Sequence, residues 1–364
     1  MSIEAEYVSR FHDGLVQYRY RVTLTKDVTQ RYVISEECLG YKNAASKSDN
    51  FTTAFRTVNG EVVEIHADEK DAFIEKFIPK TTNLVGNSSV SALFYEKVLS
   101  SKENWERWYD SRLAVNLCVA FVLGKKLHVY MEQADDHRNY FMHKVFGIHS
   151  ASDNESLERH FLMDSYVKME NNLLEVLAVD RNYVSKQGYT LFEDTVQKLY
   201  EFLRIFKPEL KGIEIERRED KDVYICDLIM VYDSYRIHAE FESTGIKKLI
   251  KLYAYLAEMV CGGIVFIDEF DSNLHDVYLC ALLEYLMEYG QGQLCFTTHN
   301  VGPMDILRRN KKSIDFLSED NSVYPWKTNG NYSPSKLYRG GMIEGSPFNV
   351  DSIDFLSAFP LEEN

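Results

Sequence analysis

The feature of this sequence that most constrains its fold is a short apolar run, Ile264 to Ile267, that ends directly in Asp268 and Glu269. Such a run is typical of a fully buried parallel strand. Ligands of open α/β sheets bind at the carboxyl ends of the strands. One carboxylate there can hold Mg²⁺ on a nucleotide, and its neighbour can orient or deprotonate a water molecule. The sequence therefore predicts a chemical site at this strand end.

A second apolar run repeats this arrangement. Leu294 to Phe296 predict another strand, and Thr297, Thr298 and His299 follow it directly. A histidine at a strand end of this kind is suited to sensing or stabilising a γ-phosphate. We expect both strands to be central and buried, with the side chains of Asp268 and His299 within about a water-bridged distance of each other.

A long amphipathic helix precedes the first of these strands. Ser243, Thr244 and Gly245 open it. Its apolar residues fall at helical spacing on one face: Leu249, Leu252, Tyr253 and Leu256. Ser243 is a suitable N-cap, and the exposed backbone amides of the first turn form an anion site. We expect the helix to begin at Ser243 and its N-terminus to face solvent.

In order and spacing, these motifs resemble those of the ABC-like, SMC-like branch of the AAA family of ATP-binding proteins, especially the abortive-infection and overcoming-lysogenization-defect ATPases. The matching residues are Ser243 and Gly245 for the signature, Asp268 and Glu269 for Walker B, Ser272 to His275 for the D-loop, and His299 for the switch histidine. Each motif alone is weak, whereas the four together are specific.

The resemblance implies an α/β fold with an ABC-type P-loop ATPase core, and ATP and Mg²⁺ as cofactors. It implies that Glu269 is the general base, that Asp268 contacts Mg²⁺ through water, and that His299 senses the γ-phosphate. Family members often act in phage defence beside an effector nuclease or toxin. The implied function is therefore ATP hydrolysis that controls a partner effector.

The same resemblance implies a homodimer, because ABC-type sites close between two chains. Ser243, Thr244 and Gly245 would then contact the nucleotide of the second subunit. Ser272 and His275, at the two ends of the D-loop, complete the implied nucleotide-binding set.

The phosphate-binding loop of the family is missing. No GxxxxGK[ST] occurs in the 364 residues, so the loop amides and lysine that hold the phosphates are absent. In the family this loop precedes a β-rich segment that resembles the start of this chain, so we expect a core that is incomplete at its N-terminus. A truncated gene, an internal start codon and a split protein with the loop on a separate polypeptide all stay open. The isolated chain should be inactive or very weak, since even one preorganised donor is worth about 3 kcal/mol to a transition state.

The resemblance also divides the chain into three parts. Residues 1–68 are the β-rich subdomain of the nucleotide-binding lobe, 69–242 a mainly helical lobe, and 243–364 the signature helix, the Walker B and switch strands and the C-terminal part of the core. Alternating patterns predict strands within 3–37 and 42–65, with a hairpin turn at Asn59-Gly60.

Helical and strand patterns fill the middle and the end of the chain. Helices are predicted at Ser89 to Leu99, Asn104 to Ala120, Ser156 to Val179, Thr190 to Phe206 and Gly302 to Arg309. Strands are predicted at Gly212 to Arg218, Tyr224 to Tyr232, Arg236 to Phe241, Ser313 to Leu317 and Ser322 to Trp326.

Composition limits the classes of partner. A net charge of −15 argues against a dominant basic groove for nucleic acid. The six cysteines show no CxxC pairing and are expected to be reduced thiols, several of them buried. His137, His143 and His149 have no regular ligand spacing and are interpreted as part of a surface loop. With no signal peptide and no apolar run long enough for a membrane, the expected location is the cytoplasm.

Two other function classes stay open. Asp268, Glu269 and Asp271 can be interpreted as the metal cluster of a Toprim-type nuclease, although that fold supplies a DxD pair and the spacing here is DxxD. The chain can also be an ATPase-derived interaction module without catalytic activity, because the P-loop is absent.

Overall fold

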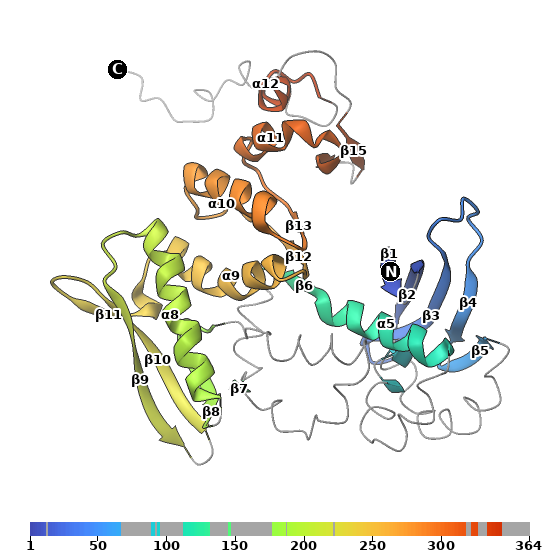
Figure 1. The fold of residues 1–364 in the computed structure, drawn as a ribbon, viewed down its shortest axis with the longest axis horizontal. Helices are drawn as coiled ribbons and strands as arrows, with labels where there is room; N and C mark the ends of the chain where they lie inside the picture. Colours follow the sequence, from blue (N-terminus) through green and yellow to red (C-terminus); the bar gives the residue numbers. More distant parts are fainter. Residues whose placement is uncertain are drawn as a thin grey trace, which may run out of the picture. The chain divides into compact units, whose positions relative to one another are not determined.

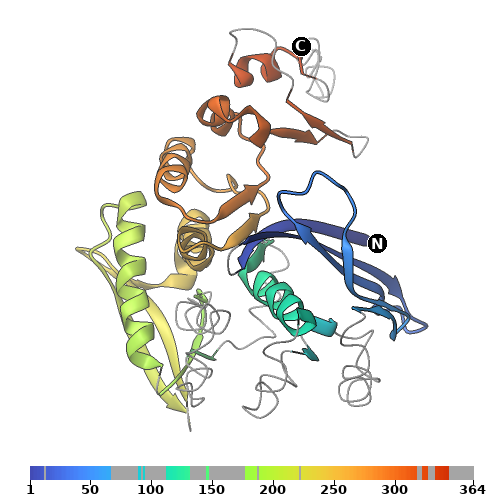
Figure 2. The same cartoon turned by 45° about the vertical axis from the view of Figure 1, so that its right-hand side comes forward.

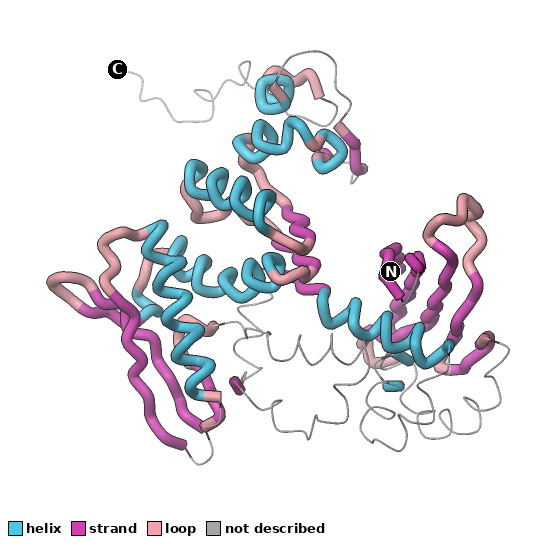
Figure 3. The backbone as a smooth tube through the Cα atoms, viewed as in Figure 1, coloured by secondary structure: helices cyan, strands magenta, loops and turns pink. Residues whose placement is uncertain are grey.

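The structure is a computed structural model, and it describes residues 1–11, 14–66, 89–91, 93–94, 112–131, 145–146, 177–186, 188–220, 223–317, 322–326 and 333–343. The fold is mixed α/β (Figures 1 and 3). The chain divides into two compact units, Met1–Leu127 with Ala151–Asn171, and His128–Ser150 with Asn172–Asn364. His137, His143 and His149, and nearly all of the predicted helix at 156–179, lie outside the described residues.

The first unit contains a five-stranded antiparallel meander, drawn in blue in Figure 1. Its strands, in spatial and chain order, are β1 (Ser2–Phe11), β2 (Gly14–Lys26), β3 (Tyr32–Asn43), β4 (Thr52–Val58) and β5 (Glu61–Ile65). The predicted hairpin turn between β4 and β5 is confirmed, because Asn59 and Gly60 both have positive φ, 49° and 82°. A two-residue turn with this backbone matches the twist of the strands that it joins.

Helix α5 (Arg112–Lys126) contributes to the core of this unit. Leu113 and Leu117 of α5 belong to the same buried cluster as Tyr18 and Phe55 of the sheet. The predicted helix at 104–120 is confirmed over residues 112–120, and α5 continues beyond it to Lys126; residues 104–111 are not described.

A buried carboxylate links β3 to the residues that follow the meander. Glu37 is 1% exposed. Its side chain accepts hydrogen bonds from the Tyr20 hydroxyl (2.9 Å), the Ser89 hydroxyl (2.7 Å) and the Val90 backbone amide (2.8 Å). Burial raises the pKa of Glu37 above its ordinary value in spite of these donors.

The second unit contains two larger sheets. In the first, β10 (Val223–Val231) pairs antiparallel with β8 (Asn182–Ser185), β9 (Gly212–Asp220) and β11 (Arg236–His238), and β7 (Val145–Phe146) pairs parallel with β8. Helix α8 (Tyr189–Phe206) lies across this sheet in Figures 1 and 2. Phe192 and Leu199 of α8 share a buried cluster with Leu228 and Met230 of β10.

The predicted strand at 236–241 is wrong over its second half. The strand ends at His238, and Ala239–Phe241 form a 3₁₀ turn. The turn forms because the His238 ring accepts a hydrogen bond from the Glu240 backbone amide at Nδ1 (3.1 Å) and so caps it.

The second sheet of this unit holds the two apolar runs that the sequence singles out. Its strand order is β13 (Gln293–Phe296), β12 (Ile264–Ile267) and β6 (Leu127–Tyr130). Strands β12 and β13 are parallel neighbours, with Val265 opposite Leu294 and Ile267 opposite Phe296. Helices α9 (Thr244–Val260) and α10 (Asp276–Tyr289) lie beside this sheet (Figure 2). Residues of both helices share a buried cluster with the sheet.

The expectation that both strands are central and buried is wrong for β13, which is an edge strand of this sheet and whose residues are exposed or half-buried. For β12 it is wrong in part. The strand is central, but only Val265 and Ile267 are buried, while Phe266 is 40% exposed. Side chains alternate between the two faces of a strand. Val265 and Ile267 face the cluster that contains α9 and α10. On the other face, Phe266 retains solvent contact.

Short elements follow β13. They are α11 (Gly302–Ile306), 3₁₀ turns at Leu307–Arg309 and Lys311–Ser313, the antiparallel pair β14 (Asp315–Leu317) and β15 (Val323–Pro325), and α12 (Pro334–Arg339). Among the helices that the structure describes, none combines the length and the apolarity that a membrane span requires. All six cysteines are free thiols, two of them buried (Cys118 and Cys226) and Cys261 exposed.

Candidate functional site

The candidate site lies where β12 and β13 end. Because the two strands are parallel and in register, Asp268 and Glu269 after β12 lie beside Thr297, Thr298 and His299 after β13. The pairing continues past both strands, since the Thr297 amide donates to the Ile267 carbonyl (3.0 Å). Asp268, Glu269, Thr297 and His299 are all exposed. The structure thus places both polar strand ends at the same edge of the sheet.

The Thr297 hydroxyl connects the two strand ends directly. It donates to Asp268 Oδ1 (2.6 Å) and accepts a hydrogen bond from the Glu269 backbone amide (2.8 Å). The Thr297 carbonyl in turn accepts a hydrogen bond from the Phe270 amide (2.9 Å). One threonine therefore fixes the orientation of the Asp268 carboxylate and the path of the backbone at Glu269.

The turn after β12 contains backbone in a sparsely populated conformation. Glu269 has φ of 48° and Asn273 has φ of 61°, the left-handed region that side chains with a Cβ seldom adopt. The turn is closed by hydrogen bonds from the Ser272 amide to the Glu269 carbonyl and from the Leu274 amide to the Asp271 carbonyl, both 3.0 Å. Such conformations persist only where neighbouring contacts hold them.

The loop after β13 is tied to the turn after β12 and to the start of α10. The His299 backbone amide donates to Asp271 Oδ1 (3.3 Å), and the Asn300 side-chain amide donates to Asp276 Oδ1 (2.8 Å). A Cβ at Gly302 would lie 2.4 Å from the same Asp276 oxygen, so only glycine fits there without a shift. These contacts hold His299 beside the turn that carries Glu269.

Helix α9 begins as predicted. Ser243 is its N-cap, and its exposed hydroxyl accepts a hydrogen bond from the Ile246 amide (3.4 Å). Thr244 Oγ1 donates to Asn273 Oδ1 (3.3 Å), and a Cβ on Gly245 would lie 2.5 Å from the Asn273 carbonyl oxygen. The N-terminus of α9 therefore packs against the 272–275 turn, and the expectation of a solvent-facing Ser243 is confirmed.

The remaining predicted site residues have structural partners. His275 is the N-cap of α10, where its Nδ1 accepts a hydrogen bond from the Val277 amide (3.4 Å). The half-buried Ser272 hydroxyl contacts the Lys248 ammonium, which also donates to the Glu269 carbonyl (2.5 Å). All eight predicted residues thus gather around α9, the 269–275 turn and the loop after β13, while their roles toward a nucleotide remain predictions.

A buried ion pair that the sequence analysis missed holds the segment before α9. The Glu242 side chain is 2% exposed and accepts hydrogen bonds from Lys207 Nζ (2.9 Å), the Ser243 amide (3.1 Å) and the Tyr232 hydroxyl. Burial favours the neutral acid, but these donors outweigh burial, so the pKa of Glu242 lies below 4.5. The sequence around Glu242 contains no pattern that distinguishes a buried glutamate from a solvent-exposed one.

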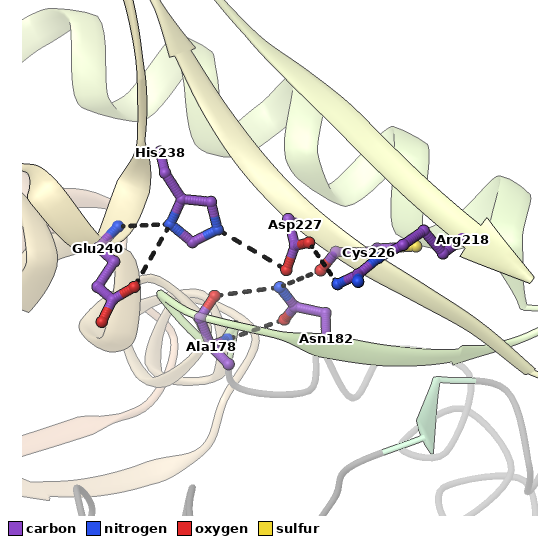
Figure 4. A network of polar contacts seen from close by, with 7 residues as sticks. All are labelled: Ala178, Asn182, Arg218, Cys226, Asp227, His238 and Glu240. Atoms are coloured by element: carbon purple, nitrogen blue, oxygen red, sulfur yellow. Dashed lines mark hydrogen bonds and ion pairs between the residues drawn. The ribbon is translucent and has the colours of Figure 1, made fainter. Parts of the chain in front are cut away.

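A second polar network orders the strands that lead to Glu242 (Figure 4). Asp227 forms an ion pair with Arg218 (3.1 Å), and His238 Nε2 lies 3.7 Å from the same carboxylate, so Asp227 connects β9, β10 and β11. Asn182, 5% exposed, donates to the Cys226 carbonyl (3.4 Å) and ties β8 to β10. Because each group bonds to a neighbouring strand, we interpret this network as structural.

The residues at the strand ends fit part of a nucleotide site. Within the part of the chain that the structure describes, no group of three or more His, Cys, Asp or Glu side chains is arranged to hold a metal ion. Asp268, exposed and oriented by Thr297, fits Mg²⁺ of the kind that takes one or two carboxylates plus phosphates and water. The sequence contains no GxxxxGK[ST] loop to hold the phosphates themselves.

No protein-family model and no curated protein matches the chain. Among solved structures, the chain is similar to "Structure of the recombination mediator protein RecF-ATPrS in RecFOR pathway", at 13% identity, 78% coverage of this chain and 76% of that chain, and a TM-score of 0.24. A TM-score this low does not establish a shared fold.

Proposed function

We propose that this chain is an ABC-like ATPase unit that binds and hydrolyses ATP at an interface between two copies and so controls a partner effector. The observation that supports the proposal is the convergence of four motifs near the carboxyl ends of the parallel strands β12 and β13. Asp268 and Glu269, the 272–275 turn, His299 and the N-terminus of α9 lie in adjoining segments joined by hydrogen bonds.

Each residue has a role that its position favours. Asp268 would contact Mg²⁺ through water, and the exposed Glu269 would accept the proton of the attacking water. His299 would sense the γ-phosphate. When bound, Mg²⁺ supplies charge that neutralises the phosphate oxygens.

The second copy would supply the other half of the site. At the N-terminus of α9, Ser243 and Thr244 are exposed and Gly245 is half-buried. An exposed helix N-terminus suits contact with a nucleotide held by the partner. The controlled effector would be a nuclease or toxin in phage defence, and the phosphate loop would come from a separate polypeptide.

A second candidate is an interaction module without catalysis. The observation that favours it is the absence of GxxxxGK[ST] from all 364 residues. Backbone amides and a lysine of that loop provide most of the grip on phosphate. Without them the scaffold would keep its partner-binding surfaces and lose turnover.

The test is phosphate release from Mg²⁺-ATP by the purified chain, alone and with a polypeptide that carries a P-loop strand, GxxxxGK[ST] loop and helix. We expect no appreciable release alone and Mg²⁺-dependent release from the mixture. Glu269→Gln should abolish release while binding of a fluorescent ATP analogue persists. Glu288→Gln, an exposed glutamate on α10, is the matched control and should behave like the wild type.

Three outcomes separate the alternatives. No nucleotide binding by the mixture would reject the ATPase proposal and leave the interaction module. An ATP-dependent dimer of Glu269→Gln in analytical ultracentrifugation, lost in Ser243→Arg, would support a site between two copies. Phosphate release by the chain alone that vanishes in Glu269→Gln would show that the chain itself contains a phosphate-binding loop without the GxxxxGK[ST] pattern. The first segment to inspect would be 86–89, of which only Ser89 is described.

A further inference from the structure

A buried lysine on α9 lies directly beneath the turn that carries Glu269. Lys248 is 2% exposed, although it stands on a helix whose neighbouring lysines, Lys247 and Lys251, are half-buried. Its ammonium donates to the Glu269 carbonyl oxygen (2.5 Å) and to the Ser272 hydroxyl. Lysine is almost never fully buried unless its charge is compensated, because desolvation of the ammonium is costly. The buried ammonium of Lys248 is therefore expected to stabilise the groups that compensate its charge.

The two acceptors lie at opposite ends of one turn. Residue 269, at the first end, has φ of 48° and carries an exposed carboxylate. Residue 272, at the second end, donates its amide to the Glu269 carbonyl (3.0 Å), the same oxygen that Lys248 contacts. The ammonium thus stabilises a carbonyl that must point toward α9 while the carboxylate of the same residue points to solvent.

The same helix contacts the turn at a second point. Thr244 and Gly245, one turn of helix before Lys248, pack against Asn273. Helix α9 therefore holds the 269–273 turn through its exposed N-terminus and through its buried lysine. A rigid helix that touches one turn twice transmits a displacement of its N-terminus to that turn.

We propose that Lys248 is a positioning residue. Its ammonium holds the 269–273 turn in the conformation that exposes the Glu269 carboxylate. It also links the conformation of this turn to the position of the N-terminus of α9. The contact of a second copy with Ser243 to Gly245 then changes the placement of Glu269 through Lys248. The consequence for hydrolysis rests on the proposed function, whereas the effect on the turn does not.

Amide hydrogen exchange of the full chain, measured by mass spectrometry without nucleotide, tests the effect on the turn. Lys248→Met removes the charge and keeps most of the side-chain volume. The Ser272 and Leu274 amides, which close the turn, should exchange at least about tenfold faster, because a hydrogen bond to a charged group is lost. Peptides from α10 and β10 should keep wild-type rates.

Two further variants keep this test decisive. Lys247→Met is the matched control, since Lys247 is the preceding lysine of α9 and contacts the Glu240 carbonyl instead (3.4 Å); it should leave the turn protected. Ser272→Ala removes one acceptor with little change in volume and should raise exchange at the same two amides less than Lys248→Met does. If Lys248→Met does not fold, this variant alone decides the outcome.

A kinetic measurement then separates this inference from the proposed function. In the reaction supplemented with the P-loop polypeptide, Lys248→Met should lower kcat with KM little changed, and Lys247→Met should change neither. Failure of the wild type to hydrolyse ATP would reject the proposed function and leave the exchange result standing. Wild-type protection of the turn in Lys248→Met and Ser272→Ala, or an equal loss of protection in α10 and β10, would overturn the positioning role.

Discussion

Replacement of Glu242 by alanine should destabilise the second unit strongly. Glu242 is 2% exposed and its partner Lys207 is 19% exposed, so the pair belongs with buried ion pairs. The substitution removes one acceptor that serves the Lys207 ammonium, the Tyr232 hydroxyl and the Ser243 amide. Loss of one partner from a buried pair typically costs about 3–5 kcal/mol. Because the lysine can regain some water, we expect a loss of about 3 kcal/mol.

The pH dependence of this loss has a defined sign. The pKa of Glu242 is lowered below its ordinary value of 4.5, so the folded state favours the carboxylate more than the unfolded state does. Its contribution is complete above pH 4.5 and disappears as the pH falls through the folded-state pKa. The difference between wild type and Glu242→Ala should therefore be large at pH 7 and shrink at about pH 3.

Urea unfolding followed by far-UV circular dichroism measures this difference, with the two units fitted as separate transitions. Asp233→Ala is the control, since the Asp233–Lys211 pair is 81% and 50% exposed and should contribute less than about 1 kcal/mol. A loss below about 1 kcal/mol for Glu242→Ala, or the same loss at both pH values, would refute the assignment of a buried, ionised pair.

Three further perturbations test other contacts. Gly245→Ala should destabilise the second unit by about 1–3 kcal/mol, because its Cβ would meet the Asn273 carbonyl oxygen at 2.5 Å. Gly124→Ala in α5 is the control, since its Cβ would meet nothing within 4 Å. In the same urea assay it should stabilise the protein by about 0.5–1 kcal/mol. Burial raises the pKa of Glu37, so the wild type should lose stability as the pH rises from 4.5 through that pKa. In thermal unfolding, the Tm of Glu37→Gln should lack this decline with pH. Curves of Tm against pH that run parallel for the two proteins would contradict the prediction. Thr297→Val removes the bridge from Asp268 to the Glu269 amide and should increase hydrogen exchange at Glu269; unchanged exchange would show that the bridge is dispensable.

The sequence predicted those features of the site that depend on neighbouring residues in the chain. Strands β12 and β13 and the N-cap Ser243 follow from an apolar run or a capping residue within a few positions. Each is found at the expected residues, although β13 is an edge strand and not a central one. The approach of the two strand ends could be expected because the carboxyl ends of neighbouring parallel strands lie at the same edge of a sheet.

Features that depend on distant residues were not predictable. The bridging role of Thr297, the buried position of Lys248 and the ion pair of Glu242 arise from partners that lie 21 to 35 positions away. The half exposure of β12 was missed because a four-residue apolar run does not reveal whether one face or both are covered. The nucleotide roles of the site residues, and the three-part division of the chain, stay predictions.

The succession of β12, α10 and β13 along the chain has a consequence for the order of folding. Contacts between segments close in sequence form early, because little chain entropy is lost in closing the loop between them. The pairing of β12 with β13, and with it the approach of Thr297 to Asp268, needs only the intervening α10. The contact of the Asp268 amide with the Tyr130 carbonyl must wait for a segment more than a hundred positions earlier to return. We therefore expect the two strand ends to be assembled in a local nucleus, before β6 completes the sheet.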